Sequence, residues 1–140
     1  MVKAMYNFEN LLKQAIEASK NSYSPYSNFP VGAAVIYENG KIYTGCNVEN
    51  VSYGLSLCAE RNAISNAISQ NEKSKIKAIA IYSPHQTLCM PCGACRQWIS
   101  EFCINEKETK IVLEDKNHSV LVMELGEIFP CSFKFDEEKN

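Results

Sequence analysis

The spacing of apolar residues along the chain predicts three helices. Apolar side chains at positions 8, 11, 12, 15 and 16 recur every three or four residues and predict an amphipathic helix from Tyr6 to about Ser22. A second helix is predicted from Cys58 to Gln70, with apolar positions 59, 63, 64, 67 and 68. A third is predicted to begin at Pro91 and to run to about Cys103, because proline is favoured in the first turn of a helix.

Short apolar runs between turn-forming residues predict five strands. They are expected at residues 31–37, 42–46, 77–82, 110–113 and 119–123, and the segment Glu38-Asn39-Gly40-Lys41 is a hairpin signal between the first two. Strands that alternate with helices indicate an α/β layer architecture. A chain of 140 residues without an internal repeat or linker indicates a single domain over residues 1–140.

Charge and cysteine content narrow the possible partners and the compartment. The net charge is −2 and no lysine–arginine cluster is present, whereas a protein that binds a phosphate backbone usually carries a basic stripe. No apolar run approaches the ~18 residues of a membrane span, and the first residues do not resemble a signal peptide. Seven cysteines, an odd number, suit a reducing compartment. We expect a cytoplasmic protein whose partners include neither a nucleic-acid polymer nor a membrane.

The segment Pro91-Cys92-Gly93-Ala94-Cys95 places two thiols three residues apart at the start of the third predicted helix. Oriented backbone dipoles at a helix N-terminus lower the pKa of a thiol, which suits either a redox pair or a thiolate metal ligand. A redox pair of this kind normally follows a strand directly, whereas a loop precedes Pro91. The surroundings therefore favour a metal site.

A catalytic zinc site takes three protein ligands and one water. Cys58 is the best third ligand because it opens the second predicted helix. Cys89 is a rival, since it lies three residues before Cys92, but Pro91 interrupts any helical row through these positions. The remaining cysteines are expected to pack in the interior: Cys46, Cys103 and Cys131.

Two charged residues beside Cys58 add to this picture. Glu60 lies two residues after Cys58, so both side chains reach one site only if it lies beyond the N-terminal end of the helix. Two helix ends are therefore expected to face one another across the metal. Three thiolates leave a zinc site with a charge of about −1, which a donating cation would offset. Arg61 and Arg96 are the candidates.

Cys58-Ala59-Glu60, followed by Pro91-Cys92-Gly93-Ala94-Cys95, resembles the signature of the zinc nucleobase deaminases, with cysteine in place of histidine. Residues 23–34, 45–50, 53–55 and 58–61 around it resemble the small, tetrameric cytidine deaminases that act on free nucleosides. This resemblance implies a three-layer α/β/α fold in which a mixed five-stranded sheet carries helices on both faces. It also implies a homotetramer whose sites are completed by neighbouring subunits.

The resemblance implies one Zn²⁺ per subunit, held by Cys58, Cys92 and Cys95, with Glu60 as the proton shuttle. The implied nucleoside contacts are Phe29 against the base, Asn47 and Glu49 at the ribose hydroxyls, Ala59 beside the substrate, and Tyr53 and Phe133 reaching a neighbouring subunit's site. Val51 stands where the family usually has alanine. Without the resemblance, Asn47 would be interpreted as a loop-capping residue and Phe29 as a core aromatic.

The implied reaction is the hydrolytic deamination of cytidine and deoxycytidine to uridine and deoxyuridine plus ammonia, in pyrimidine salvage. Zinc lowers the pKa of bound water from 15.7 to about 7. The hydroxide attacks C4 while Glu60 moves the proton to N3 and then to the leaving amine. Three alternatives stay open: a deaminase of a cytosine-bearing antibiotic such as blasticidin S, a polynucleotide editor, and a zinc-stabilised binding module closed by Cys89 or His85.

Overall fold

The structure is a computed structural model that describes the backbone of residues 2–136 and the side chains of residues 8–136. In chain order its elements are α1 (Val2–Ser19), β1 (Gly32–Tyr37), β2 (Ile42–Cys46), the 3-10 turn η1 (Tyr53–Leu55), α2 (Ala59–Ser69), β3 (Ile76–Tyr82), α3 (Gly93–Phe102), β4 (Lys110–Glu114), β5 (Val120–Glu124) and α4 (Leu125–Ile128).

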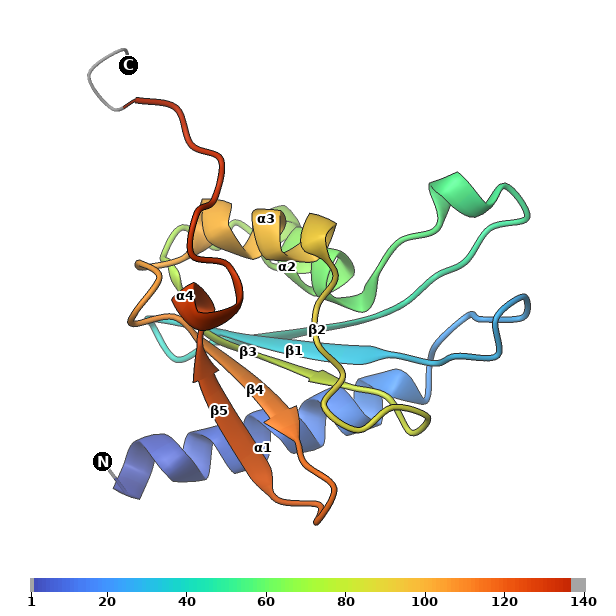
Figure 1. Ribbon diagram of the computed structural model, residues 1–140, viewed down its shortest axis with the longest axis horizontal. Coiled ribbons are helices and arrows are strands. Elements are labelled where there is room, and N and C mark those ends of the chain that lie inside the picture. The colour runs from blue at the N-terminus through green and yellow to red at the C-terminus, as the bar shows by residue number, and fades with distance from the viewer. Residues whose placement is uncertain (1, 137–140) are drawn as a thin grey trace.

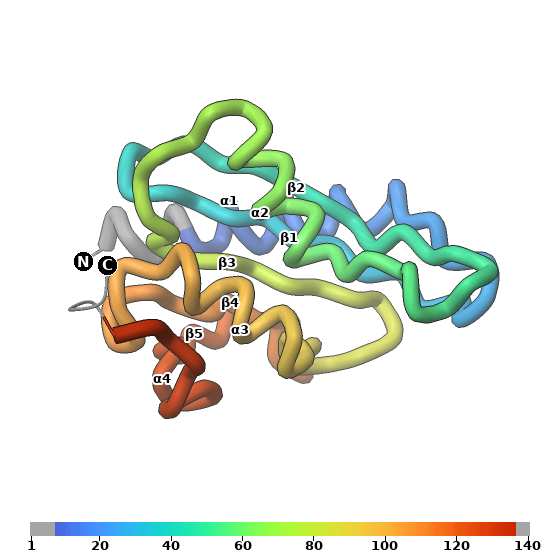
Figure 2. The backbone as a smooth tube through the Cα atoms, turned by 90° about the horizontal axis from the view of Figure 1, so that it is seen from above, coloured from blue at the N-terminus to red at the C-terminus, as the bar shows by residue number. Residues whose placement is uncertain are grey.

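The strands form one sheet in the order β2-β1-β3-β4-β5. β1 is antiparallel to both β2 and β3, β3 is parallel to β4, and β4 is antiparallel to β5. Figure 1 shows α1 on one face of this sheet and α2 and α3 on the other, and Figure 2 shows α2 and α3 side by side over the strands. The expected α/β/α fold with a mixed five-stranded sheet is confirmed.

Alternation along β1 divides the core between the two faces of the sheet. Ala34 and Ile36 pack with α1 through Leu11, Leu12 and Ala15. The intervening residues 33, 35 and 37 belong to the other core, beneath α2 and α3. Because helices cover both faces of the sheet, the sequence of β1 is a continuous apolar run and does not alternate between apolar and polar residues.

Gly45 in β2 allows α2 to lie close to the sheet. A Cβ atom at this position would lie 2.4 Å from the backbone nitrogen of Ala63 and 2.8 Å from the carbonyl oxygen of Ala59. No side chain fits between backbones at these distances. The missing Cβ therefore fixes the first turns of α2, and with them the N-terminal end of that helix, against β2.

Several boundaries differ from those expected. α1 covers Val2–Ser19 instead of 6–22; residues 20–22 leave the helix because Tyr23 pairs with Val48 and the Ser22 hydroxyl donates to Asn47. The sequence pattern does not predict η1 or α4, which are too short to show a helical period. Among the described residues, none of the helices combines the length and the hydropathy that crossing a membrane requires.

Candidate metal centre and active site

Cys58 and Cys92 are the N-cap residues of α2 and α3. Both have extended backbone angles, with φ −72° and ψ 152° at Cys58 and φ −67° and ψ 169° at Cys92. Neither thiol makes a capping hydrogen bond to the backbone N–H groups of its helix. The expectation that α3 begins at Pro91 is wrong by two residues, because the N-terminal cap falls on Cys92 and Gly93 is the first helical residue. The two N-caps place both thiols just beyond helix ends.

The Sγ atoms of Cys58, Cys92 and Cys95 all lie within 4.8 Å of one another. Tetrahedral zinc with Zn–S bonds of about 2.3 Å separates its sulfur ligands by about 3.8 Å, so this cluster fits zinc in both donor type and spacing. Cys89 does not belong to the cluster within the described part of the chain. Of the two alternatives for the third sulfur, the structure brings Cys58 to the pair.

The thiols of the cluster interact electrostatically with one another and with Arg61. A hydrogen bond from Cys95, reinforced by the nearby guanidinium, lowers the pKa of Cys58 to about 5. The hydrogen bond to Cys58 and burial raise the pKa of Cys95. The two thiols therefore share a proton, and Cys58 is the more acidic of the two. Binding of a divalent cation to thiolates releases such protons.

The two candidate arginines have different partners. Arg61 Nη2 donates to Cys58 Sγ at 3.4 Å, as a cation that offsets thiolate charge should. Arg96 instead donates from Nε to the carbonyl of Pro91 at 2.7 Å and from Nη1 to the carbonyl of Ile128 at 2.6 Å. Arg96 therefore braces the segment before Cys92 against the end of α4, a role that the sequence pattern does not reveal.

Glu60 is the second residue of α2 and is only 5% exposed. Burial raises the pKa of its carboxyl, and the neighbouring Cys58 thiolate adds to the rise. Glu60, Cys58 and Cys92 line one cavity of about 270 Å³. The i and i+2 residues thus meet beyond the N-terminal end of α2, as the geometry of the helix requires. A carboxyl with a raised pKa in such a place is suited to proton transfer.

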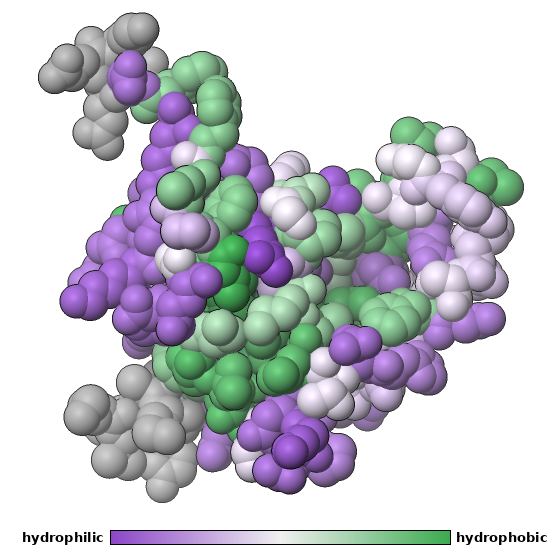
Figure 3. All heavy atoms as spheres, viewed as in Figure 1, coloured by the Kyte–Doolittle hydropathy of each residue, from purple (hydrophilic) through white to green (hydrophobic). Residues whose placement is uncertain are grey.

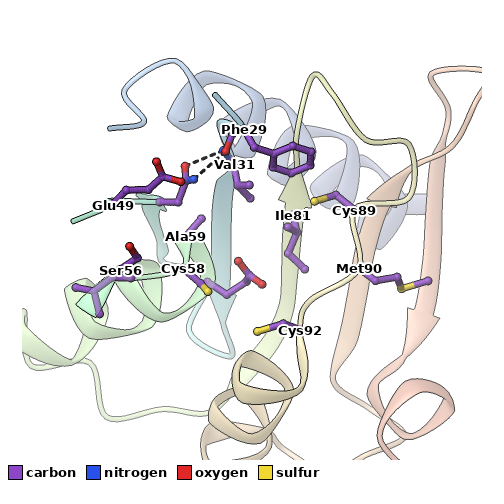
Figure 4. Close-up of a pocket in the computed structure, with 13 residues that line it drawn as sticks. Phe29, Val31, Glu49, Ser56, Cys58, Ala59, Ile81, Cys89, Met90 and Cys92 are labelled. Carbon is purple, nitrogen blue, oxygen red and sulfur yellow. Dashed lines mark hydrogen bonds between the residues drawn. The ribbon is translucent and has the colours of Figure 1, made fainter. Parts of the chain in front are cut away.

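Asn47 and Glu49 line the same cavity, and both side chains form hydrogen bonds with the segment 26–31. Asn47 Oδ1 accepts from the backbone N–H of Val31 and its Nδ2 donates to the carbonyl of Phe29, both at 2.8 Å (Figure 4). Glu49 accepts from the backbone N–H groups of Tyr26 and Ser27 and from the Ser27 hydroxyl, which lower the pKa of its carboxyl. Asn47 is therefore a loop-fixing residue as well as part of the cavity wall.

Phe29 and Ala59 also line the cavity, whereas three other positions lie outside it. Tyr53, in η1, is 74% exposed and its ring lies 5.8 Å from that of Tyr26. Phe133 is 71% exposed; its backbone N–H and carbonyl bond to Gln97 of α3. Val51 is 75% exposed and does not line the cavity of its own chain.

Part of the cavity wall is not predicted by the sequence. The additional lining residues are Val31, Ser56, Leu57, Ile81, Cys89 and Met90. Ile81 lies near the end of β3, and Cys89 and Met90 lie in the loop that follows this strand. The predicted end of this strand was therefore the sequence feature that could have indicated these residues.

The cysteines outside the cluster differ in burial. Cys131 is exposed, and the expectation that it packs in the interior is wrong; Cys103 is buried and Cys46 half-buried. Burial raises the pKa of Cys89 to about 11, which leaves a neutral thiol in the wall.

Comparisons with known proteins agree with this site. A family model for the "Cytidine and deoxycytidylate deaminase zinc-binding region" matches residues 5–111. The cytidine deaminase of Halalkalibacterium halodurans is 38% identical over 127 residues, 91% of this chain and 94% of that protein. The cytidine deaminase of Mycobacterium tuberculosis is 41% identical over 129 residues, 91% of both. The crystal structure of cytidine deaminase from Burkholderia pseudomallei matches with a TM-score of 0.80 at 39% identity, covering 89% of this chain and 98% of that one.

These matches and the paired helix ends place the chain among the zinc-dependent deaminases that share this α/β/α fold. More narrowly, the chain belongs to the cytidine and deoxycytidylate deaminase family. The relatives and structural neighbours named above are cytidine deaminases, so the expectation that the chain is a hydrolytic deaminase is confirmed.

Proposed function

We propose that the protein hydrolyses cytidine and deoxycytidine to uridine and deoxyuridine, with release of ammonia, in pyrimidine salvage. The observation that carries this proposal is the arrangement within one cavity: the buried Glu60 carboxyl and two thiols of the cluster, Cys58 and Cys92, line it together with Asn47 and Glu49. Figure 4 shows Glu49 on the side of the cavity away from Cys92. A nucleoside has the same polarity, with a cytosine C4 at one end and sugar hydroxyls at the other.

Cys58, Cys92 and Cys95 would hold one Zn²⁺ per subunit, and Arg61 would offset the charge of the thiolates through Cys58. When bound, zinc supplies a Lewis acid that lowers the pKa of water from 15.7 to about 7. Glu60 takes the proton released from the attacking water and gives it to N3, then helps to protonate the departing amine. Its burial supports this role, because the protonated carboxyl is stabilised where water is scarce.

The remaining groups would bind and orient the nucleoside. The Glu49 carboxylate is held by the backbone N–H groups of residues 26 and 27 and lines the cavity, which suits a hydroxyl donor such as the 3′-OH. Asn47 Nδ2 has a second hydrogen beyond the one given to Phe29, and we assign it to the sugar. Phe29 would pack on the base, and Ala59 would contribute the backbone at the start of α2. A site built to bond hydroxyls rejects analogues that lack them strongly.

The assembly that we propose is a homotetramer of single-domain subunits acting in the cytoplasm. An arm from residue 47 to 57 projects from the body in Figure 1, and Figure 3 shows hydrophobic side chains at its tip. Val51, Tyr53 and Leu55 are at least 67% exposed there, a patch of the kind that marks protein interfaces. In such a tetramer Tyr53 and Phe133 would reach neighbouring sites. Three closely spaced free thiols are compatible with a reducing compartment.

The test is an assay of the purified protein with cytidine, deoxycytidine, cytosine and blasticidin S, following ammonia and the change in cytosine absorbance. We expect turnover of both nucleosides and little turnover of free cytosine, which lacks the sugar that Asn47 and Glu49 would bind. Turnover of blasticidin S without turnover of the nucleosides would support the antibiotic deaminase instead. Zinc binding without turnover of any of the four would support a binding module.

A further inference from the structure

The cavity has two chemically different walls. One belongs to α2 and is polar: the Glu60 carboxyl and the backbone N–H groups of the first helical turn lie there. The other is apolar and includes Phe29, Ile81 and Cys89, which lie together in Figure 4. Figure 4 shows the sulfur of Cys89 directed into the cavity between Phe29 and Ile81, whereas the side chain of Met90 extends away from it.

Cytosine has a matching asymmetry. N3 and O2 form a polar edge, and C5 and C6 form an edge that carries only carbon and hydrogen. If the proposed function is right, N3 faces Glu60, because that carboxyl must reach it with a proton. The C5 edge then faces away from α2 and toward the apolar wall.

We propose that Cys89 determines which substituents at C5 of the pyrimidine the site accepts. A neutral thiol behaves as a small apolar group, and it is smaller than the isoleucine, phenylalanine and methionine around it. Its Sγ atom projects from a loop rather than from a strand, so the space in front of it depends on that one side chain. Substituents at C5 therefore compete with Cys89 for volume, and Cys89 is a specificity-determining residue rather than a catalytic one.

The experiment compares kcat/KM for cytidine, 5-methylcytidine and 5-iodocytidine in the wild type, Cys89→Ala and Cys89→Ile. The electronic effect of the substituent on C4 is common to all three proteins, so changes in the ratio of 5-iodocytidine to cytidine report space at C5. We expect Cys89→Ala to raise that ratio about 10-fold or more and Cys89→Ile to lower it by a similar factor, the scale on which apolar pockets discriminate. 5-Methylcytidine should show smaller changes in the same directions.

Cys103→Ala is the matched control, because Cys103 is as buried as Cys89 but lies outside the cavity. It should leave the ratio unchanged. Zinc content, measured for each variant, and the affinity for uridine and 5-iodouridine, measured by calorimetry, provide readouts that do not depend on turnover. The two Cys89 variants shift the ratio in opposite directions, so either one decides the matter if the other does not fold.

An unchanged ratio in a Cys89 variant that deaminates cytidine would overturn the assignment of Cys89 and leave the proposed function intact. A parallel loss with all three substrates would equally overturn it, since that is the effect of a merely structural change. If the wild type deaminates none of the three, the proposed function fails first.

Discussion

Among single residues, Glu60 shows most directly how the surroundings of a side chain affect its protonation. Its carboxyl is nearly excluded from solvent, beside a thiolate and at a helix N-terminus. Burial favours the protonated form and the helix dipole favours the charged form, so the two influences oppose each other. A group balanced in this way can both take and return a proton.

Glu60→Gln should therefore lower kcat/KM for cytidine by at least about 10²–10⁴-fold, since the amide keeps the size of the side chain but cannot accept the proton. The zinc content should remain one per chain, because the three thiols are untouched. Ammonia release and metal analysis of the same preparation measure both quantities. Glu101→Gln, an exposed position on α3, is the control and should behave as the wild type. Near-normal turnover of Glu60→Gln would exclude Glu60 as the proton shuttle.

Glu72 is a second buried carboxylate, with a structural role. It accepts hydrogen bonds from Asn39, Tyr43 and Ser74, and thereby ties the β1–β2 hairpin to the loop before β3. The backbone N–H of Ser74, followed by the side chains of Asn39, Ser74 and Tyr43, lowers the pKa of Glu72 to about 2. The charged form is thus the form that stabilises the fold.

The sign of the resulting pH dependence follows from this depressed pKa. The contribution of Glu72 to stability is present above its ordinary pKa of 4.5 and is lost as the pH falls toward about 2. Glu72→Gln should lower Tm by several degrees at neutral pH, and the difference from the wild type should shrink between pH 4.5 and 2. Thermal unfolding followed by circular dichroism at each pH measures it. A difference that is constant over this range would contradict the assignment.

At the scale of elements, the sequence predicts the sheet, the three long helices and the meeting of two helix ends. The last prediction holds because it depends only on helical geometry, in which Cys58 and Glu60 cannot share a flank. Other features depend on contacts between distant segments and have no local pattern. The hydrogen bonds that Asn47 donates to Phe29 and accepts from Val31 are of this kind, and so is the one that Arg96 donates to Ile128. The start of α3 also differs from the prediction: the helix begins at Gly93, with Cys92 as its N-cap, rather than at Pro91.

Gly45 gives an element-scale prediction, because it sets the distance between β2 and α2. Gly45→Ala should lower the free energy of unfolding by about 1–3 kcal/mol, the usual cost of overpacking a core. It should also lower kcat, since a displaced α2 carries Cys58 and Glu60 with it. Urea unfolding and the cytidine assay measure the two effects. Gly54→Ala, where a Cβ would meet nothing within 4 Å, should leave the stability unchanged. Equal stabilities of the two variants would show that α2 can shift at no cost.

At the scale of the whole molecule, several aromatic side chains of the described residues lie outside the hydrophobic core. Tyr53 lies on the projecting arm, and Phe133 follows α4 in the chain, where its ring pairs with the ring of Phe135. Neither residue lines the cavity of its own subunit. Both positions are accounted for if neighbouring subunits of a closed, symmetric assembly supply them to one another's sites.

Mixing two inactive variants tests this sharing directly. Glu60→Gln lacks the proton shuttle, and Phe133→Ala, on our proposal, lacks the ring that covers a neighbour's site and excludes water from it. Combined under conditions that exchange subunits, they should recover activity, because some sites then pair an intact Glu60 with an intact Phe133 from the adjacent chain. Recovery should increase with the extent of exchange, measured by native mass spectrometry. If Phe133 acted only within its own chain, every mixed site would still lack one of the two groups, and exchange without recovery would be observed.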